Sequence, residues 1–159
     1  MHKLSTLFFV AFFGLFIPSF SQSVSVIKYD QLEQIIKSNN DELLVVNFWA
    51  TWCGPCVKEL PHFESLDTKP GIRVLLVSLD FPEELGKVTG LVERKALKSE
   101  VFLLDETDYD SYMRKVSEDW SGAIPATLFV RSDRKSFFYE KAFDEQSLEK
   151  TVTELMDKR

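Results

Sequence analysis

The fold is decided by the stretch LLVVNFWATWCGPC, residues 43–56, which joins an apolar run to the only two cysteines of the chain. Residues 43–49 are apolar with one interruption, Asn47, as expected of a buried central strand in a parallel sheet. Cys53 and Cys56 follow directly, at C-x-x-C spacing. We therefore predict a strand, a short turn and a helix that begins at the cysteine pair.

The cysteine pair is suited to redox chemistry. A thiolate is the reactive form of cysteine, and the unpaired N–H groups and positive dipole end of a helix N-terminus stabilise it. One helical turn separates the two sulfurs, so one can displace the other from a mixed disulfide. We predict Cys53 as an exposed nucleophile and Cys56 as a more buried resolving thiol. A purely structural disulfide is the alternative, although C-x-x-C spacing cannot join distant parts of a fold.

Metal binding is the other chemistry open to a C-x-x-C pair. Structural zinc takes four ligands and soft copper sites also need further donors. Beyond the first few residues the chain holds one histidine, His62, six positions after Cys56, and no second cysteine pair. We therefore predict no metal site and no cofactor, and we expect His62 at the surface.

The first 21 residues have the layout of a secretory signal peptide. Lys3 supplies a positive charge, residues 7–17 are an unbroken apolar run, and Ser19-Phe20-Ser21 is a small-x-small cleavage site. The run is shorter than the roughly 20 residues needed to cross a bilayer. We predict a signal peptide at 1–21 and one domain at 22–159, exported to the periplasm or another extracytoplasmic space. A retained anchor is the alternative, and only then is membrane contact expected.

The charge balance narrows the range of partners. The chain has 25 acidic and 19 basic residues and a formal net charge of −6. An acidic surface without a basic run argues against nucleic acid and against anionic membrane surfaces as partners.

The remaining sequence alternates strands with helices, which predicts an α/β sheet with right-handed crossovers. Pro61 is expected to kink the cysteine helix, and Asp144 to cap the last helix. The last two strands are expected to pair antiparallel. Besides 43–49, we predict strands at 23–28, 72–79, 101–104, 127–130 and 136–139, and helices at 30–38, 53–66, 82–97, 109–116 and 145–156.

These motifs resemble those of thioredoxin-fold proteins. The likeness rests on residues 46–56 with the following Glu59-Leu60-Pro61, and on residues 122–127, GAIPAT, which resemble the family's cis-proline loop. The segment between Asp80 and Pro125 is longer than a plain thioredoxin needs there. The resemblance therefore implies a central mixed sheet flanked by helices, with an inserted strand–helix unit before the cis-proline loop, as in the exported TlpA/ResA-like branch.

The resemblance also implies roles for residues around the pair. The cis-proline loop would face the cysteines, with Pro125 in cis and the backbone of Ile124 pairing with an extended substrate peptide. Trp52 would pack beside the nucleophile, limit its contact with solvent and shape partner contact. The Gly54-Pro55 dipeptide belongs in this family with reductants rather than with strong oxidants.

One acidic residue is a candidate for proton transfer. Thioredoxin has a buried Asp beneath the pair, at the position that Asn47 occupies here, and Asn cannot titrate. Glu59 lies three residues after Cys56 on the same helix face, and ResA-like reductases carry Glu at this spacing. We predict that Glu59 accepts the proton that Cys56 must lose. A solvated surface glutamate is the alternative.

Four other residues are harder to assign. Trp49 is expected in the core, and Trp120 either in the core or lining the site. Asp80 and Asp105 end strands at the edge where we expect the active site, and nothing else in the sequence marks them.

The pattern as a whole favours an exported thiol–disulfide oxidoreductase that reduces protein disulfides, with cytochrome c maturation as one setting. Its partners would be disulfide-containing proteins and a membrane-bound thiol electron donor. A disulfide oxidase or isomerase is the nearest alternative. A thiol peroxidase of this fold would carry Thr or Ser three residues before Cys53, where Ala50 stands. A copper-binding module would carry C-x-x-x-C and a later histidine.

Overall fold

The computed structural model describes residues 23–41 and 43–157. The predicted signal peptide, residues 1–21, lies outside the described residues. Within the described ranges, no helix is both long enough and apolar enough to cross a membrane.

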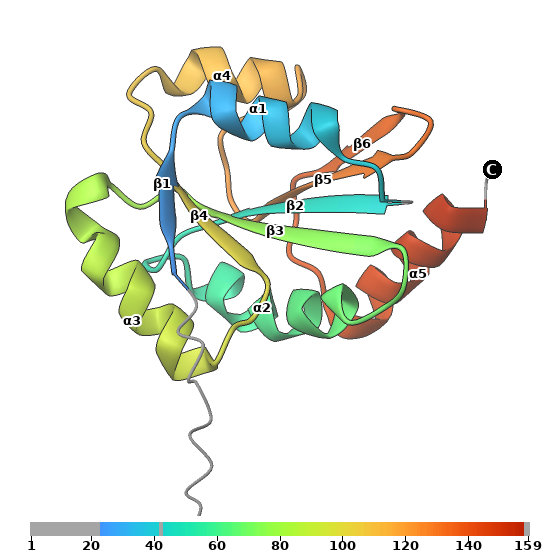
Figure 1. Cartoon of the computed structure of the whole chain (residues 1–159), viewed down its shortest axis with the longest axis horizontal. Helices are drawn as coiled ribbons and strands as arrows, with labels where there is room; N and C mark the ends of the chain where they lie inside the picture. Colours follow the sequence, from blue (N-terminus) through green and yellow to red (C-terminus); the bar gives the residue numbers. More distant parts are fainter. Residues whose placement is uncertain (1–22, 42, 158–159) are drawn as a thin grey trace, which may run out of the picture.

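A six-stranded mixed sheet forms the centre of the molecule, in the order β1-β4-β3-β2-β5-β6 (Figure 1). The neighbours β1–β4, β4–β3 and β3–β2 are parallel, whereas β5 is antiparallel to both β2 and β6. The strands are β1 (Ser25–Ile27), β2 (Leu43–Trp49), β3 (Ile72–Ser78), β4 (Glu100–Leu104), β5 (Ala126–Arg131) and β6 (Ser136–Tyr139).

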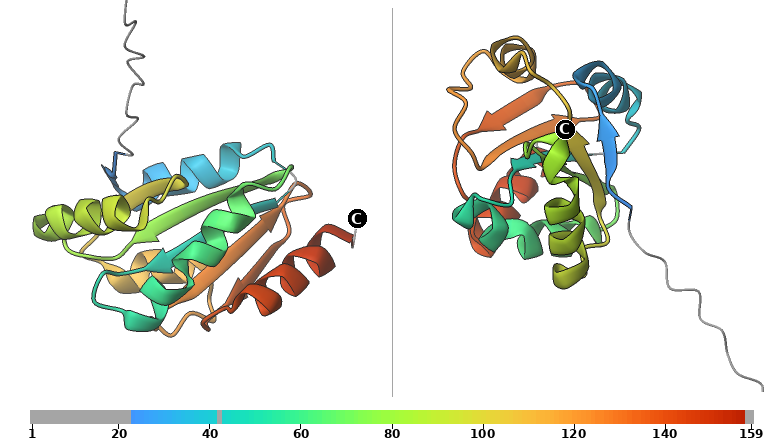
Figure 2. Two further views of the ribbon diagram at one scale, coloured as in Figure 1. Left: turned by 90° about the horizontal axis from the view of Figure 1, so that it is seen from below. Right: turned by 90° about the vertical axis from the view of Figure 1, so that its left-hand side faces the viewer.

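Helices cover both faces of the sheet: α1 and α4 lie on one face, and α2, α3 and α5 on the other (Figures 1 and 2). Because its two faces are both covered, every residue of β2 is buried, as its apolar run predicts. The helices are α1 (Tyr29–Ser38), α2 (Gly54–Asp67), α3 (Leu85–Lys95), α4 (Tyr109–Val116) and α5 (Glu145–Asp157).

The side chains of β2 alternate between two apolar cores. Val45 and Trp49 pack with Leu60 and Phe63 of α2 on one face. Phe48 points to the other face and packs against Trp120, with ring centroids 4.7 Å apart. The side chains of β2 therefore contribute to the apolar packing on both faces of the sheet.

The expected architecture, a mixed sheet flanked by helices, is confirmed. The segment between β3 and β5 forms α3, β4 and α4, and the added strand β4 lies between β1 and β3. The single helix predicted at 82–97 is wrong in extent. A short 3-10 helix, η1 (Pro82–Glu84), precedes α3, and Ala96 ends α3 with a left-handed φ of 51°. Pro61 lies inside α2, which continues beyond it to Asp67.

Candidate active site

Cys53 and Cys56 form a disulfide where β2 passes into α2. Cys53 is the N-cap of α2, and its Sγ accepts the backbone N–H of Cys56 at 3.3 Å. Val57 N–H bonds the Cys53 carbonyl, which closes the first helical turn around the pair. In the reduced protein the same N–H and the helix dipole can stabilise a thiolate at Cys53.

Burial around the pair differs from the sequence expectation in two ways. Cys56 is fully buried, as predicted, but Cys53 is itself only 7% exposed in the disulfide form. Trp52, expected to pack beside the nucleophile, is itself 65% exposed. Gly54 and Pro55 are also exposed. The exposed surface beside the disulfide is therefore formed by the Trp52 side chain and by Gly54 and Pro55.

The loop before β5 faces the disulfide. Its Ile124–Pro125 peptide bond is cis, and the Ile124 carbonyl oxygen lies 3.8 Å from the Sγ of Cys53. Gly122 adopts a φ of 97°, in the left-handed region that favours glycine. Sequence reasoning thus places this loop against the pair correctly, although the two are about 70 residues apart in the chain.

Trp120 has the first of the two roles that the sequence left open, packing in the core, and it also contacts the cis-proline loop. Its ring is 6% exposed and packs against Phe48, so it belongs to the core on the α1 and α4 side. Its indole N–H donates to the Ala123 carbonyl at 2.9 Å and so ties the loop to that core. Trp49 is fully buried, as expected.

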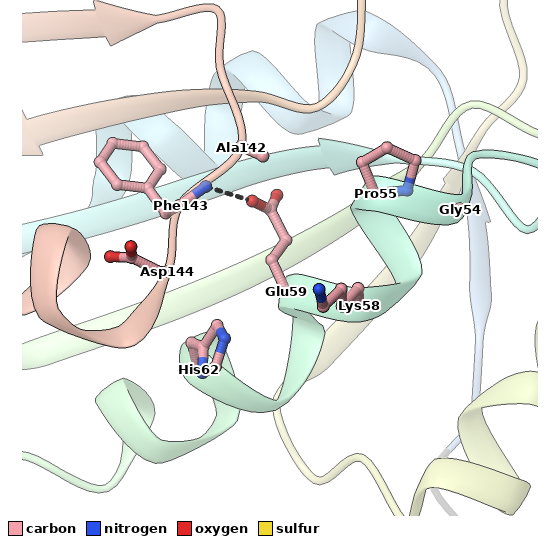
Figure 3. A pocket seen from close by; sticks show the side chains of 8 residues that line it. All are labelled: Gly54, Pro55, Lys58, Glu59, His62, Ala142, Phe143 and Asp144. Atoms are coloured by element: carbon pink, nitrogen blue, oxygen red, sulfur yellow. Dashed lines mark hydrogen bonds between the residues drawn. The ribbon is translucent and has the colours of Figure 1, made fainter.

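Glu59 is buried, which excludes the reading of a solvated surface glutamate. It is 2% exposed, and its carboxylate points from α2 toward the chain at Phe143 (Figure 3). One oxygen accepts the Phe143 N–H at 2.7 Å, and the other accepts Nδ2 of Asn47 at 2.9 Å. Asn47 also donates to Oγ1 of Thr127 at 3.2 Å, whereas its own Oδ1 has no partner among the described residues.

Two opposing effects act on the Glu59 carboxyl. Burial raises the pKa of Glu59 above its ordinary value of 4.5, while the bonds from Phe143 and Asn47 lower it, and burial is the larger effect. The group therefore holds its proton to a higher pH than a solvated glutamate.

A pocket of about 490 Å³ opens between the first turns of α2 and the chain that precedes α5 (Figure 3). Glu59 forms part of its wall, so solvent or substrate can approach the buried carboxyl from this side. His62 is half-buried there rather than fully at the surface as predicted. The lining residues are Gly54, Pro55, Lys58, Glu59, His62, Ala142, Phe143 and Asp144.

The structure gives contacts at the site to two acidic residues, of which sequence reasoning noted Asp80 without a role and missed Glu140. Asp80, 1% exposed, accepts hydrogen bonds from both the backbone and the hydroxyl of Thr51, two residues before Cys53. Glu140, after β6, accepts the N–H and the hydroxyl of Ser121 at the start of the cis-proline loop. The only available signal was the position of Asp80 at a strand end, which Asp105 shares; Asp105 instead pairs with Lys28.

No cluster of three or more His, Cys, Asp or Glu side chains is placed to hold a metal ion within 23–41 and 43–157.

Comparison with known proteins places this geometry in a family. The model of the Thioredoxin family matches residues 23–91. A thioredoxin of Malassezia sympodialis is 33% identical over 101 residues, covering 63% of this chain and 86% of that protein. The thiol-disulfide oxidoreductase ResA of Bacillus cereus is 30% identical over 105 residues, covering 65% of this chain and 56% of ResA. The crystal structure of a thioredoxin-related protein from Neisseria meningitidis shares the fold, with a TM-score of 0.66, 20% identity, and 77% and 90% of the two chains covered.

Proposed function

This chain belongs to the thioredoxin family and is a thiol–disulfide oxidoreductase, and we propose that it is exported and reduces disulfides in protein substrates. The observation that carries the proposal is the Cys53–Cys56 disulfide at the start of α2, 3.8 Å from the Ile124 carbonyl of the cis-proline loop. The proposed nucleophile Cys53, the proposed resolving thiol Cys56 and the Ile124 carbonyl that can accept a hydrogen bond from substrate therefore lie close together.

The proposed reaction begins with the reduced pair. The Cys53 thiolate attacks a substrate disulfide, so that a mixed disulfide forms and one substrate thiolate leaves. Cys56 then loses its proton, and its thiolate attacks the Sγ of Cys53 and expels the second substrate thiolate. Two electrons have passed to the substrate, and the enzyme ends as the disulfide present in this structure.

We assign Glu59 as the group that takes the proton from Cys56. Its position one helical turn after Cys56 makes the two side chains neighbours. Burial and the raised pKa of Glu59 support this assignment, because the group holds a proton more readily than a solvated carboxyl and lines the pocket through which it can pass that proton on. A surface carboxylate would offer neither property.

The substrate surface is assigned to five residues around the disulfide. The exposed Trp52 gives a broad apolar contact beside the nucleophile. The backbone at Ile124, before the cis Pro125, offers a carbonyl to an extended peptide. Gly54 and Pro55 leave room for the approaching chain, because neither presents a large side chain.

Direction and cellular setting rest on the resemblance to the ResA-like branch. The Gly-Pro dipeptide favours a reductant, and the N-terminal sequence favours export, with residues 1–21 removed. A reductant outside the cytoplasm must be reduced again, so a membrane-bound thiol donor belongs to the proposal. Apocytochrome c is one candidate substrate.

The reduction potential of the Cys53–Cys56 couple tests the direction. The purified domain is equilibrated against dithiothreitol or glutathione buffers, and the reduced fraction is read by thiol alkylation. A value of about −270 mV, that of thioredoxin, is expected of a reductant. A value near about −120 mV would instead make the protein a disulfide donor or isomerase.

A trapping experiment tests the assignment of the two sulfurs. The Cys56→Ser variant keeps the nucleophile and lacks the resolving thiol, so it should accumulate mixed disulfides with a reducible protein such as insulin. Cys53→Ser is the matched control and should trap none. The reverse result would exchange the roles of the two cysteines.

A further inference from the structure

Both carboxylate oxygens of Asp80 accept hydrogen bonds from neighbouring residues, although Asp80 has no role in the reaction proposed above. It is 1% exposed at the end of β3. One oxygen accepts the Thr51 N–H at 2.8 Å and the Ser78 hydroxyl at 2.7 Å, and the other accepts the Thr51 hydroxyl. A buried carboxylate is costly unless it is paired in this way, so the fold retains it for its bonds.

The bond from Thr51 to Asp80 takes the place of a backbone hydrogen bond at the point where β2 and β3 separate. Trp49 pairs with Ser78, and the Leu79 N–H still bonds the Trp49 carbonyl at 2.8 Å. An ideal parallel ladder would next join the Thr51 N–H to the Leu79 carbonyl. Here the Asp80 side chain takes that N–H instead. The loop can therefore leave the sheet at Thr51 without an unpaired buried donor.

The residue fixed in this way lies close to the reacting sulfur. Thr51 is two positions before Cys53, whose N–H bonds the Ala50 carbonyl at 3.1 Å in a tight turn. Rotation of Thr51 would move this turn and, with it, the Sγ of Cys53 relative to the Ile124 carbonyl. Trp52, between the two, has little packing of its own to hold the loop, because it is 65% exposed.

We propose that Asp80 is a positioning residue for thiol–disulfide exchange. Its buried carboxylate fixes Thr51 and thereby keeps the Sγ of Cys53 at its place opposite the cis-proline loop. The inference rests on the proposed function of the cysteine pair. It assigns Asp80 no contact with substrate and no proton transfer. Its effect is expected in the rate of exchange, since a displaced nucleophile reacts slowly even in a folded protein.

Four variants, each fully reduced and kept below its unfolding temperature, separate positioning from stability. Asp80→Ala removes every acceptor and should slow reduction of insulin disulfides about tenfold per folded molecule. Asp80→Asn keeps an oxygen for the Thr51 N–H and can donate to the Thr51 hydroxyl, so it should stay within about twofold of wild type. Thr51→Val loses the hydroxyl bond alone and should slow exchange about threefold.

Asp67→Ala is the matched control. Asp67 accepts the Val74 N–H at 2.7 Å toward the opposite end of β3, so its loss should lower stability without changing the exchange rate. Equal rates for Asp80→Ala and wild type, or equal slowing by Asp67→Ala, would show that Asp80 has only a structural role. Equal slowing by Asp80→Asn and Asp80→Ala would also overturn positioning by hydrogen bonds.

The same variants also cover two other cases, an Asp80→Ala variant that does not fold and a wild-type protein that is inactive. If Asp80→Ala does not fold, Thr51→Val carries the test, and a wild-type rate in that variant overturns the proposal. If the wild-type protein itself cannot reduce insulin, the proposed function fails and the inference with it. An active wild type with an unaffected Asp80→Ala variant removes the role of Asp80 alone.

Discussion

Replacing Glu59 tests whether its buried carboxyl titrates as the structure indicates. Glu59→Ala removes the acceptor of the Phe143 N–H, whereas Asn47 keeps its bond to Thr127. One buried N–H without a partner costs about 1–3 kcal/mol. Glu59→Gln should cost about 1 kcal/mol or less, because its oxygen accepts from Phe143 and its amide N–H can reach the unpaired Oδ1 of Asn47 once that side chain turns over.

The pH dependence gives the sharper result. Burial raises the pKa of Glu59 above 4.5, so the folded state binds this proton more tightly than the unfolded state. The stabilising contribution of the neutral group is therefore complete below pH 4.5 and is lost as the pH rises through the raised pKa. Glu59→Gln has no such loss, so its stability relative to wild type should improve between pH 4 and pH 7.

Urea unfolding of the oxidised proteins at several pH values measures this difference, because oxidation keeps the two thiols from titrating. All other carboxyl groups are common to both proteins and cancel in the comparison. Parallel curves for wild type and Glu59→Gln would show that the pKa of Glu59 is the same in both states. That result would refute both the raised pKa and the proton-transfer role built on it.

Three further variants test the supports of the site. Trp120→Phe loses the indole bond to Ala123 and should cost about 0.5–1.5 kcal/mol in urea unfolding, with slower insulin reduction. Glu140→Gln probes a carboxylate whose pKa is lowered by the hydroxyl and the N–H of Ser121. That contribution is present above pH 4.5 and lost as the pH falls through the lowered pKa, so wild type and variant should converge in acid. Phe143→Ala removes a ring packed edge-on against three others and should cost about 3–5 kcal/mol, seen as a lowered melting temperature.

The sequence predicts the centre of this fold well because the information there is local. The run at 43–49 is apolar on both faces, and only a strand covered on both sides accommodates it. Cys53 follows at the first turn of a helix, where its backbone surroundings are largely set by its neighbours. The sequence does not mark the boundaries of the helix predicted at 82–97, because Gly86 and Gly90 lower the helix propensity of the whole segment.

The polar contacts of the site could not be predicted because each joins distant segments. Glu59 meets the Phe143 N–H across 84 positions, and Asn47 meets Thr127 across 80. A sequence pattern marks Glu59 as a neighbour of Cys56, but burial of its carboxyl depends on the chain that passes over it before α5. The same limit applies to Trp52, which stays 65% exposed among the residues that the structure describes.

The two reactive loops are held by carboxylates that arrive from other strands. Asp80 follows β3 and holds the loop of Cys53, and Glu140 follows β6 and holds the loop of Pro125. The cysteine loop follows β2, and its acceptor Asp80 follows the parallel neighbour β3. The cis-proline loop precedes β5, and its acceptor Glu140 follows the antiparallel neighbour β6. These hydrogen bonds act together with the apolar packing of Cys53 and Ile124 on the two loops that face each other across the disulfide. Because the bonds from Ser121 lower the pKa of Glu140, the hold on the cis-proline loop should be lost only as the pH falls through that lowered pKa.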